Sequence, residues 1–350
     1  MKRYAFFQCD LGVGGIQKSI INLLRNLDYS RVRVDLFLSE KNDFWDISFP
    51  AGVTVHYLRP VPRILSFLPY EIAAKFIRFD FSDYPMYDLA VDFNSYQFSC
   101  AKGALTIPAE KRVMWIHNDV EKKLAEEWKY RILWYNFRGK FKHYDGFVPV
   151  SEGLIEPFQK MSGQKDKTYT VIQNYIDTEE IHKKMTEPVE NFNVDPDYFN
   201  LVAVGKLCHQ KGYDLMLPIV AKALQQRKDL RLYIMGDGPE KESLLQLGED
   251  LGIADHVIFL GNRENPFAIM SQMDAFISTS RYEGQPLNIM EAKAVGLPLF
   301  CAKNLEKYTE DLCGYEDLTD ALASAVRQPK KPDNLIGYNQ KILQSVLMLG

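Results

Sequence analysis

The sequence predicts an α/β fold with two Rossmann-like, doubly wound domains facing each other across a cleft. Short apolar runs of strand length alternate with stretches of helical apolar spacing along most of the 350 residues. Turns that contain glycine follow several of these runs, as is typical of parallel sheets whose loops approach a ligand. A chain of this length is sufficient for two domains of roughly 150 residues each.

The composition is that of an ordinary globular chain, with 46% apolar and 25% charged residues and a net charge of −4. We expect no nucleic-acid partner. The five cysteines are far apart and form no C-x-x-C pair, which favours a reducing compartment. Neither a signal peptide nor an apolar run of 18 residues is present. We therefore expect a cytoplasmic protein, with peripheral contact at the inner face of a membrane as an option.

Residues 1–177 are predicted to form the first domain. An apolar run at residues 3–8 leads through the turn D-L-G-V-G-G into a helical pattern that ends near Leu27. Gly14 and Gly15 would let this turn approach a ligand closely. The dinucleotide pattern G-x-G-x-x-G is not met, because Gln17 occupies the third glycine position. Further strands are expected at residues 32–38, 53–58, 89–93, 113–116, 146–150 and 168–172.

Two stretches of the first domain combine apolar or aromatic side chains with basic ones. Residues 60–81 contain three prolines and predict an irregular helix, and residues 121–142 predict a helix whose second half is basic and aromatic. Such stretches are suited to rest on lipid headgroups. The alternative is an aromatic stripe that faces the core, with a solvated basic face on its other side.

The strand at residues 113–116 ends in His117-Asn118-Asp119. Ligands of open α/β sheets bind beyond the carboxyl ends of the strands, so His117 is a candidate functional residue. A structural role at the strand end is the alternative. The loops between about Asp43 and Phe81 and around Tyr96 contain no pattern that identifies a ligand.

Residues 178–198 are polar and acidic and are predicted to be a linker. Their D-x-D sequence, Asp195-Pro196-Asp197, would hold a metal–diphosphate complex only beside a sheet, so we expect no metal site there. Residues 199–330 repeat the strand–helix alternation. The turn after their first strand carries Lys206 and Lys211, where a diphosphate would need positive charge. Strands are expected at residues 201–204, 230–235, 256–260, 274–278 and 297–301, and a last helix at about residues 334–347.

Residues 274–298 predict a buried strand, a loop, and a helix with Pro286 at its first position and Gly296 just past its end. The helix start offers the N–H groups of Leu287 and Asn288 and a partial positive charge, which suit a phosphate. Glu283 before the helix and Glu291 within it accept hydrogen bonds, which suits sugar hydroxyls. This arrangement matches a nucleotide sugar, and an exposed helix with ordinary surface acids is the alternative.

Several sequence segments occur in the order typical of one family: G-V-G-G, W-I-H-N-D, V-I-Q-N-Y-I-D, V-G-K-L-C-H-Q-K-G, I-M-G-D-G-P and E-G-Q-P-L-N-I-M-E-A-K-A-V-G-L-P. Together they resemble the retaining nucleotide-sugar glycosyltransferases of family 4, which have the two-Rossmann GT-B architecture. The resemblance covers most of the chain and is strongest from Leu201 to Pro298.

The resemblance implies a role for each matching residue. Glu283 would contact the donor sugar near the reacting carbon, and His117 would face the same sugar, so these two are the catalytic candidates. Glu291 would hold the ribose hydroxyls. The remaining donor-binding candidates are Lys206 and Lys211 for the diphosphate, Gly14 and Gly15 for a close approach of the first turn, Arg263 with its backbone at the base edge, and Gln285, Leu287 and Asn288 around the helix start.

The resemblance also implies an activity. A hexosyl or N-acetylhexosaminyl unit would pass, with retention, from a nucleotide-diphosphate sugar to a glycan or lipid-linked acceptor in cell-surface polysaccharide biosynthesis. A UDP-sugar is favoured, and no metal or further cofactor is expected. Residues 1–177, completed by the C-terminal helix 334–350, would form the acceptor domain, and residues 199–330 the donor domain. Acceptor recognition would fall to the first domain's loops between about Asp43 and Phe81 and around Tyr96.

Two departures from the family pattern limit this transfer of roles. Lys206 stands where arginine is common, and the segment at residues 302–316 looks shortened. Three alternatives stay open: a nucleotide-sugar epimerase, a non-catalytic partner subunit of another glycosyltransferase, and an NAD oxidoreductase. The epimerase reading is disfavoured by the E-G-x-P-x-N-x-x-E run, and the oxidoreductase reading by the missing third glycine.

Overall fold

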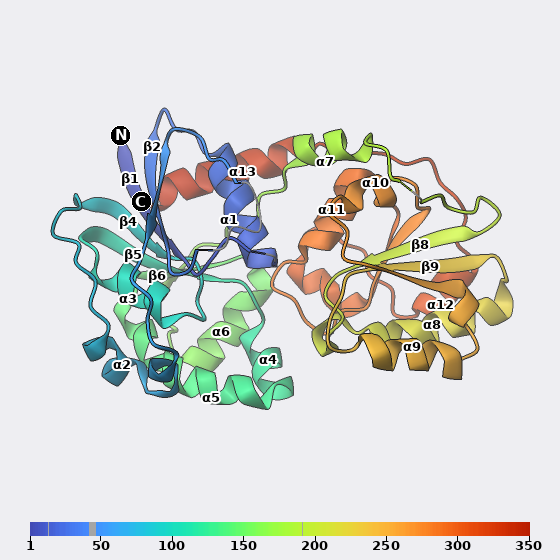
Figure 1. The fold of residues 1–350 in the computed structure, drawn as a ribbon, viewed down its shortest axis with the longest axis horizontal. Helices are drawn as coiled ribbons and strands as arrows, with labels where there is room; N and C mark the ends of the chain where they lie inside the picture. The colour runs from blue at the N-terminus through green and yellow to red at the C-terminus, as the bar shows by residue number, and fades with distance from the viewer. Residues whose placement is uncertain (13, 42–46, 191) are drawn as a thin grey trace. The chain divides into compact units, whose positions relative to one another are not determined.

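The protein is described here from a computed structural model, which covers residues 1–12, 14–41, 47–190 and 192–350 (Figure 1). Val13 in the first glycine turn and residues 43–46 of the expected acceptor loops lie outside the described residues. The chain forms two compact units, Met1–Tyr175 with Gly337–Gly350, and Ile176–Ile336. Each unit contains a parallel sheet with helices on both faces, which confirms the predicted class of two Rossmann-like domains.

The first unit contains a seven-stranded sheet in the order β3-β2-β1-β4-β5-β6-β7. The central strands β1 and β4 are apolar in their middle residues because helices cover both faces, and Tyr4, Phe6 and Phe7 are fully buried. The order reverses between β1 and β4, so the loops that follow these two strands meet at the switch point of the sheet. The strands are β1 (Lys2–Gln8), β2 (Val32–Leu38), β3 (Val53–Tyr57), β4 (Tyr87–Asp92), β5 (Ala109–Ile116), β6 (Gly146–Pro149) and β7 (Thr168–Tyr169).

The helices of the first unit include one from the far end of the chain. The C-terminal helix returns to the first strand, where Lys2 Nζ and Tyr4 Oη each donate to the Leu347 carbonyl at 3.0 Å. The helices are α1 (Gly15–Asn26), α2 (Tyr70–Phe76), α3 (Phe98–Thr106), α4 (Val120–Glu126), α5 (Trp128–Phe137), α6 (Ile155–Ser162) and α13 (Ile336–Leu349), with 3-10 turns η1 (Arg63–Phe67), η2 (Arg138–His143) and η3 (Glu152–Leu154).

The second unit contains a five-stranded parallel sheet in the order β10-β9-β8-β11-β12. In Figure 1, α10 and α11 lie on one face of this sheet and α8, α9 and α12 on the other. The strands are β8 (Phe199–Val204), β9 (Leu230–Met235), β10 (Val257–Gly261), β11 (Ala275–Ser278) and β12 (Leu299–Cys301). The helices are α7 (Thr178–Met185), α8 (Tyr213–Gln226), α9 (Lys241–Asp250), α10 (Pro266–Met270), α11 (Leu287–Val295) and α12 (Leu318–Ala323), with 3-10 turns η4 (His209–Lys211), η5 (Ala254–His256) and η6 (Lys303–Tyr308).

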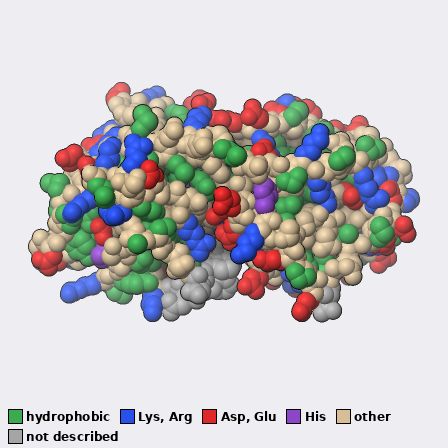
Figure 2. All heavy atoms as spheres, turned by 90° about the horizontal axis from the view of Figure 1, so that it is seen from above, with side chains coloured by type: hydrophobic (Ala, Val, Ile, Leu, Met, Phe, Trp, Pro, Cys, Tyr) green, Lys and Arg blue, Asp and Glu red, His purple; other side chains and the backbone are tan. Residues whose placement is uncertain are grey.

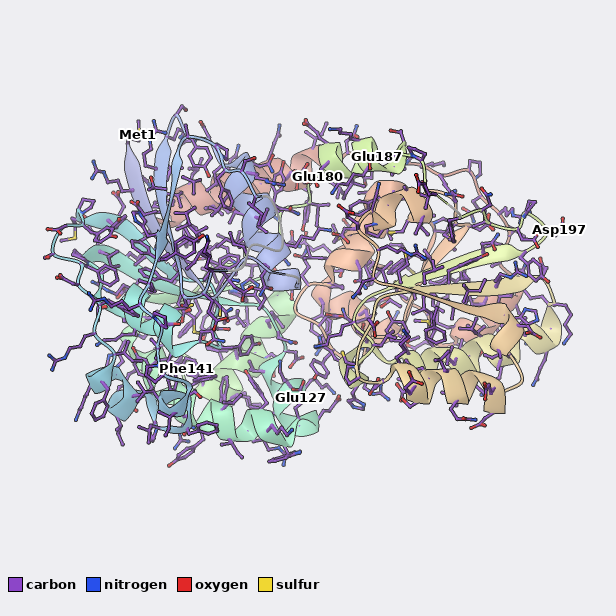
Figure 3. All side chains as sticks on the ribbon, viewed as in Figure 1. Met1, Glu127, Phe141, Glu180, Glu187 and Asp197 are labelled. Atoms are coloured by element: carbon purple, nitrogen blue, oxygen red, sulfur yellow. The ribbon has the colours of Figure 1, made fainter. Side chains whose placement is uncertain are left out.

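The predicted linker at residues 178–198 is not a spacer, because it belongs to the second unit. Its first eight residues form α7, which the Asp177 side chain caps by accepting from the Glu180 N–H at 3.0 Å. His182 Nε2 bonds to the Ala294 carbonyl at 2.9 Å, which ties α7 to α11. Glu180, Glu187 and Asp197 in Figure 3 mark the course of this segment.

The predicted helix at residues 121–142 is broken into α4, α5 and η2. Glu127, labelled in Figure 3, has the extended backbone angles φ −111° and ψ 96° and separates α4 from α5. Arg131 stabilises the break, since its guanidinium donates to the carbonyls of Leu124 and Ala125 at the end of α4. The change of direction turns Trp128, which continues the apolar spacing of the sequence, toward solvent.

One smaller correction concerns the start of α11 in the second unit. Pro286 is the cap that precedes α11 and not its first residue, while Gly296 ends the helix in the left-handed conformation at φ 87°. The segment at 302–316, which the sequence suggested is shortened, contains η6 and an isolated bridge between Ala302 and Tyr315.

Charged side chains of both signs are spread over the face shown in Figure 2, consistent with the small net charge. Among the described residues, no helix combines the length and the apolar character that crossing a bilayer requires.

Candidate functional site

The switch point of the second sheet lies between β8 and β11, where the strand order changes direction. The turn after β8 and the loop after β11 therefore meet at one edge. Thr279 Oγ1 donates to the Gly212 carbonyl at 2.8 Å and joins the two segments. Gly212 has φ +66°, and a Cβ there would collide with the Thr279 carbonyl oxygen. Only glycine fits this contact, so the sequence K-G at 211–212 sets how closely the two segments approach.

The loop after β11 is held in place by a side chain that the sequence did not single out. Arg281 forms a bidentate ion pair with Asp214 at 2.7 and 2.6 Å and also donates to the His209 carbonyl at 2.8 Å. The Arg281 guanidinium holds the pKa of Asp214 below its usual range. Asn304 Nδ2 donates to the Ser280 and Arg281 carbonyls at 3.0 Å. These bonds fix the loop that carries Glu283.

Lys211 and Glu283 form an ion pair, with Nζ 2.6 Å from Oε1. Gln210 Nε2 lies 3.3 Å from the other carboxylate oxygen and donates to the Tyr282 carbonyl at 3.0 Å. The Glu283 side chain is only 8% exposed and that of Lys211 21%. The sequence predicted these two residues to contact different parts of one ligand, and the structure brings them together directly.

The start of α11 lies beside this pair on the same edge of the sheet. Asn288 Nδ2 donates to the Val204 carbonyl at 2.7 Å, which anchors the helix start to the end of β8. The backbone N–H groups of Leu287 and Asn288 precede the first intrahelical bonds, which the N–H groups of Ile289 and Met290 make to the Pro286 carbonyl. They are therefore available to an anion. The side chains of Gln285 and Glu291 are buried at 6% and 7% exposure.

The other donor-binding candidates of this unit lie farther from the ion pair. Lys206 is exposed in the turn after β8. Arg263 is exposed in the turn after β10, two strands away from β8, which corresponds to about 10 Å across the sheet. Gly236 N–H donates to the Gly261 carbonyl at 2.9 Å and connects that turn to the one after β9.

Gly14 and Gly15 lie at the switch point of the first sheet, at the start of α1. Gly14 precedes the helix with extended angles, φ 170° and ψ 161°, and Gly15 is its first residue. Among the residues that the structure describes, no side chain caps this helix start, and its first turn contains no acidic residue. Asp10 Oδ1 accepts from the Gly12 N–H at 2.7 Å and orders the preceding turn. The helix start could accept an anionic or hydroxyl-bearing ligand.

His117 follows β5 and contacts the loop after β4. Its Nε2 bonds to the Phe93 carbonyl at 2.9 Å, and its ring lies 4.6 Å from the Phe93 ring. Because a carbonyl only accepts, Nε2 carries the proton. Burial lowers the pKa of His117 to about 3, so the ring is neutral at pH 7 and Nδ1 keeps its lone pair. His117 can therefore accept a hydrogen bond from a ligand hydroxyl through Nδ1.

Residues 185–342 match the model of the family described as glycosyl transferases group 1. An uncharacterized glycosyltransferase of Methanocaldococcus jannaschii is 24% identical over 217 residues, which cover 61% of this chain and 53% of that protein. The N-acetylgalactosamine-N,N'-diacetylbacillosaminyl-diphospho-undecaprenol 4-alpha-N-acetylgalactosaminyltransferase of Campylobacter jejuni is 29% identical over 157 residues, 45% of this chain and 41% of that protein. The matches thus span about half, or less, of these two relatives.

Among solved structures, Anabaena HepE in complex with UDP and glucose aligns with a TM-score of 0.64 and 18% identity, covering 99% of this chain and 93% of that one. At this identity the likeness shows the fold alone. Residues 185–342 thus resemble a glycosyltransferase family, and the whole chain has a fold similar to that of HepE.

Proposed function

We propose that the protein transfers a hexosyl or N-acetylhexosaminyl unit, with retention, from a UDP-sugar to a glycan or lipid-linked acceptor in cell-surface polysaccharide biosynthesis. The observation that carries the proposal is the cluster of Lys211, Glu283 and the start of α11 at the switch point of the second sheet. We choose a uridine donor for this proposal because HepE, which shares the fold, was solved with UDP and glucose. The likeness to a transferase that acts on diphospho-undecaprenol supports a lipid-linked acceptor.

The donor diphosphate would lie against the N–H groups of Leu287 and Asn288 and the Lys211 ammonium. These groups carry fixed positive potential toward the position where the leaving nucleoside diphosphate develops negative charge. Because this potential comes from the chain itself, the reaction would need no metal ion. Lys206 and the turn at Arg263 would contact the outer phosphate and the base.

The sugar hydroxyls of the donor would be held by acceptor groups. Glu283 would bind the transferred sugar and Glu291 the ribose, since a carboxylate accepts from two hydroxyls at once. His117, neutral at pH 7, would accept a hydroxyl of the transferred sugar through Nδ1. A cationic imidazole could not do so, because both ring nitrogens would then donate.

Nucleotide release from a panel of UDP- and GDP-sugars, with product analysis, tests this function. We expect release with a UDP-sugar, and loss of most of it in Glu283→Ala, while Glu249→Ala, an exposed glutamate on α9, retains it. An epimerase would convert the sugar without releasing nucleotide, a non-catalytic partner would release none, and an oxidoreductase would respond to NAD. Release that survives Glu283→Ala would remove the role proposed for Glu283.

We further propose that the first unit contacts anionic lipid through one amphipathic surface. Its apolar part consists of exposed side chains on η1, α2 and α5. Phe67, Phe76 and Trp128 are 71%, 68% and 63% exposed, which is unusual for such large apolar side chains gathered on one surface. Asn136 Nδ2 donates to the Ser66 carbonyl at 3.2 Å and joins α5 to η1. The exposed apolar residues of the amphipathic surface are Ile64, Phe67, Ile72, Phe76, Trp128, Ile132 and Tyr135.

The charge of this surface matches anionic headgroups. Residues 128–143 contain no acidic residue, and four of their five lysines and arginines are exposed, whereas Lys140 is buried. The Arg138 guanidinium lies 4.5 Å from the Tyr135 ring centre and Lys129 Nζ lies 5.7 Å from that of Trp128. Aromatic rings beside cations are typical of side chains that anchor at a membrane interface. A lipid-linked acceptor would be reached from such a position.

Cosedimentation with phosphatidylcholine vesicles, with and without phosphatidylglycerol, tests the surface. We expect binding only with the anionic lipid, weakened by salt and reduced at least about tenfold in the triple variant Phe67→Ser/Phe76→Ser/Trp128→Ser. The matched control is Leu215→Ser/Leu245→Ser, which removes exposed apolar side chains of the second unit. Equal binding of both variants would contradict the proposal.

A further inference from the structure

A buried ion pair lies behind the loop that holds His117. Asp92 ends β4 and Lys140 belongs to η2, and both side chains are 0% exposed. Lys140 Nζ donates to Asp92 Oδ2 at 3.0 Å, and Tyr144 Oη donates to the same oxygen at 2.6 Å. Burial raises the pKa of Asp92, which the Lys140 charge and the Tyr144 bond oppose. Figure 3 labels Phe141, the residue that follows Lys140 in η2.

The buried pair stabilises the fold less than apolar residues of the same volume would. Two charges without water contribute little net stability, and apolar replacements are often as stable or more so. Asp92 Oδ1 is buried without a hydrogen-bond partner among the described residues, which adds to the cost. Stability alone therefore does not account for a lysine at this position.

Lys140 makes a second contact that does have a consequence for the site. Its Nζ donates to the Ser95 carbonyl at 2.8 Å, in the loop between β4 and α3. The same loop contains Phe93, whose carbonyl accepts from His117 Nε2 and whose N–H donates to the Phe7 carbonyl at 3.0 Å. The loop is thus tied to the sheet at Phe93 and to η2 at Ser95.

We propose that Lys140, fixed by Asp92, is a positioning residue that sets the tautomer and orientation of His117 through the 93–95 backbone. A fixed Phe93 carbonyl keeps the proton on Nε2 and leaves Nδ1 as the acceptor. If the loop moved, the bond to Nε2 would weaken and the proton would distribute between the two nitrogens. Only the effect on catalysis rests on the proposed function, because the tautomer is a property of the free protein.

The test uses ¹⁵N shifts of the His117 ring at pH 7 in the full chain without ligand. The main variant is Asp92→Asn/Lys140→Met, which removes both charges together and leaves no uncompensated ion in the interior. We expect the wild type to show a single Nε2–H tautomer and the double variant a mixture of tautomers. Tyr144→Phe, which keeps the bond from Lys140 to the Ser95 carbonyl, should retain the wild-type tautomer.

A destabilised variant separates positioning from a general loss of stability. Val34→Ala removes buried volume on β2, two strands from β4, and should lower the unfolding midpoint without changing the His117 spectrum. A folded double variant with an unchanged His117 tautomer would overturn the proposal. If the double variant does not fold, Lys140→Arg replaces it, because a larger planar cation cannot keep the same bond to the Ser95 carbonyl in a packed interior.

Kinetics with a UDP-sugar distinguish this inference from the proposed function. A misplaced His117 should lower kcat about tenfold to a hundredfold with a smaller change in KM for the donor. A tautomer change without any transferase activity in the wild type would support the positioning role and reject the proposed function. A normal tautomer with lowered kcat would reject the positioning role alone.

Discussion

Lys211 and Glu283 would each bind a different part of a nucleotide sugar, yet they bind each other in the structure at 2.6 Å. A donor diphosphate would compete with the Glu283 carboxylate for the Lys211 ammonium. Once the diphosphate occupies the lysine, Glu283 is free to accept sugar hydroxyls. The ion pair would therefore hold both groups in place, at a moderate cost to donor affinity, until the donor arrives.

Glu283→Gln should accordingly bind UDP more tightly than the wild type while losing sugar transfer. Removing a partly buried ion pair of about 1 kcal/mol corresponds to roughly fivefold in affinity. Lys211→Met should do the opposite and weaken UDP binding. Isothermal titration with UDP measures both, with Glu249→Gln as the control. Weaker UDP binding in Glu283→Gln would mean that the carboxylate does not compete with the diphosphate.

His117 should make the first unit sensitive to acid. Its pKa is lowered to about 3 in the folded protein, below the value of about 6.5 for an unfolded chain. The unfolded state therefore binds a proton first, so this stability is present above pH 6.5 and is lost as the pH falls toward 3. The free energy of unfolding should fall by at most about 1.4 kcal/mol for each pH unit in this range.

Urea unfolding of the full chain at pH 7 and pH 5 measures this loss of stability. We expect His117→Gln to lose less stability than the wild type between the two pH values. The exposed His143 provides the control, since His143→Gln should leave the wild-type dependence unchanged. The same loss in all three proteins would show that other groups govern the acid response.

At the scale of elements, Gly212 decides how closely the turn after β8 approaches the loop after β11. Gly212 and Gly252 both have left-handed backbone angles, at φ +66° and +67°. A Cβ on Gly252 meets nothing within 4 Å, whereas one on Gly212 would collide with the Thr279 carbonyl. A comparison of the two glycines therefore separates the cost of backbone strain from the loss of the contact between the Gly212 turn and the Thr279 loop.

Gly252→Ala should cost about 1 kcal/mol of stability, the expense of a left-handed alanine. Gly212→Ala should cost about 3 kcal/mol, because the Thr279 segment must also move. Only Gly212→Ala should weaken UDP binding, since it shifts Lys211 relative to Glu283. Unfolding midpoints and UDP titrations of the two variants check this. Equal effects on UDP binding would indicate that the turn is not part of the donor site.

At the scale of the whole molecule, each unit has its own buried core. That of the second unit includes Leu201, Leu217, Val220, Leu232 and Ile277, all within residues 176–336. The residues proposed for the diphosphate and the ribose also belong to this unit. The proposed acceptor contacts and His117 belong to the other.

Residues 176–336 produced alone should therefore fold and bind UDP with an affinity of the same order as the full chain. They should transfer no sugar, because His117 and the acceptor residues are missing. Circular dichroism and UDP titration of the isolated unit check the two expectations. A folded unit that does not bind UDP would mean that the first unit contributes directly to nucleotide affinity.

Much of the architecture follows from local sequence. Apolar runs of strand length give the two parallel sheets, Gly296 ends α11 where its position predicts, and Glu283 and Glu291 bracket the start of that helix. These features depend on periodicity, capping and turn chemistry, which act over a few residues. The local pattern also gave one wrong prediction. Residues 121–142 have continuous helical spacing, yet the helix is broken at Glu127.

The contacts that give the site its chemistry join residues far apart in the chain. Lys211 pairs with Glu283 across 72 residues, Asp214 with Arg281 across 67, and Asp92 with Lys140 across 48. No local pattern encodes such pairs, because the sheet order and the approach of two turns decide which side chains meet. The sequence determined which elements form and which residues could bind a nucleotide sugar. The tertiary structure alone decided that the proposed phosphate cation and sugar acid are partners, and that a buried lysine holds the loop against which His117 is oriented.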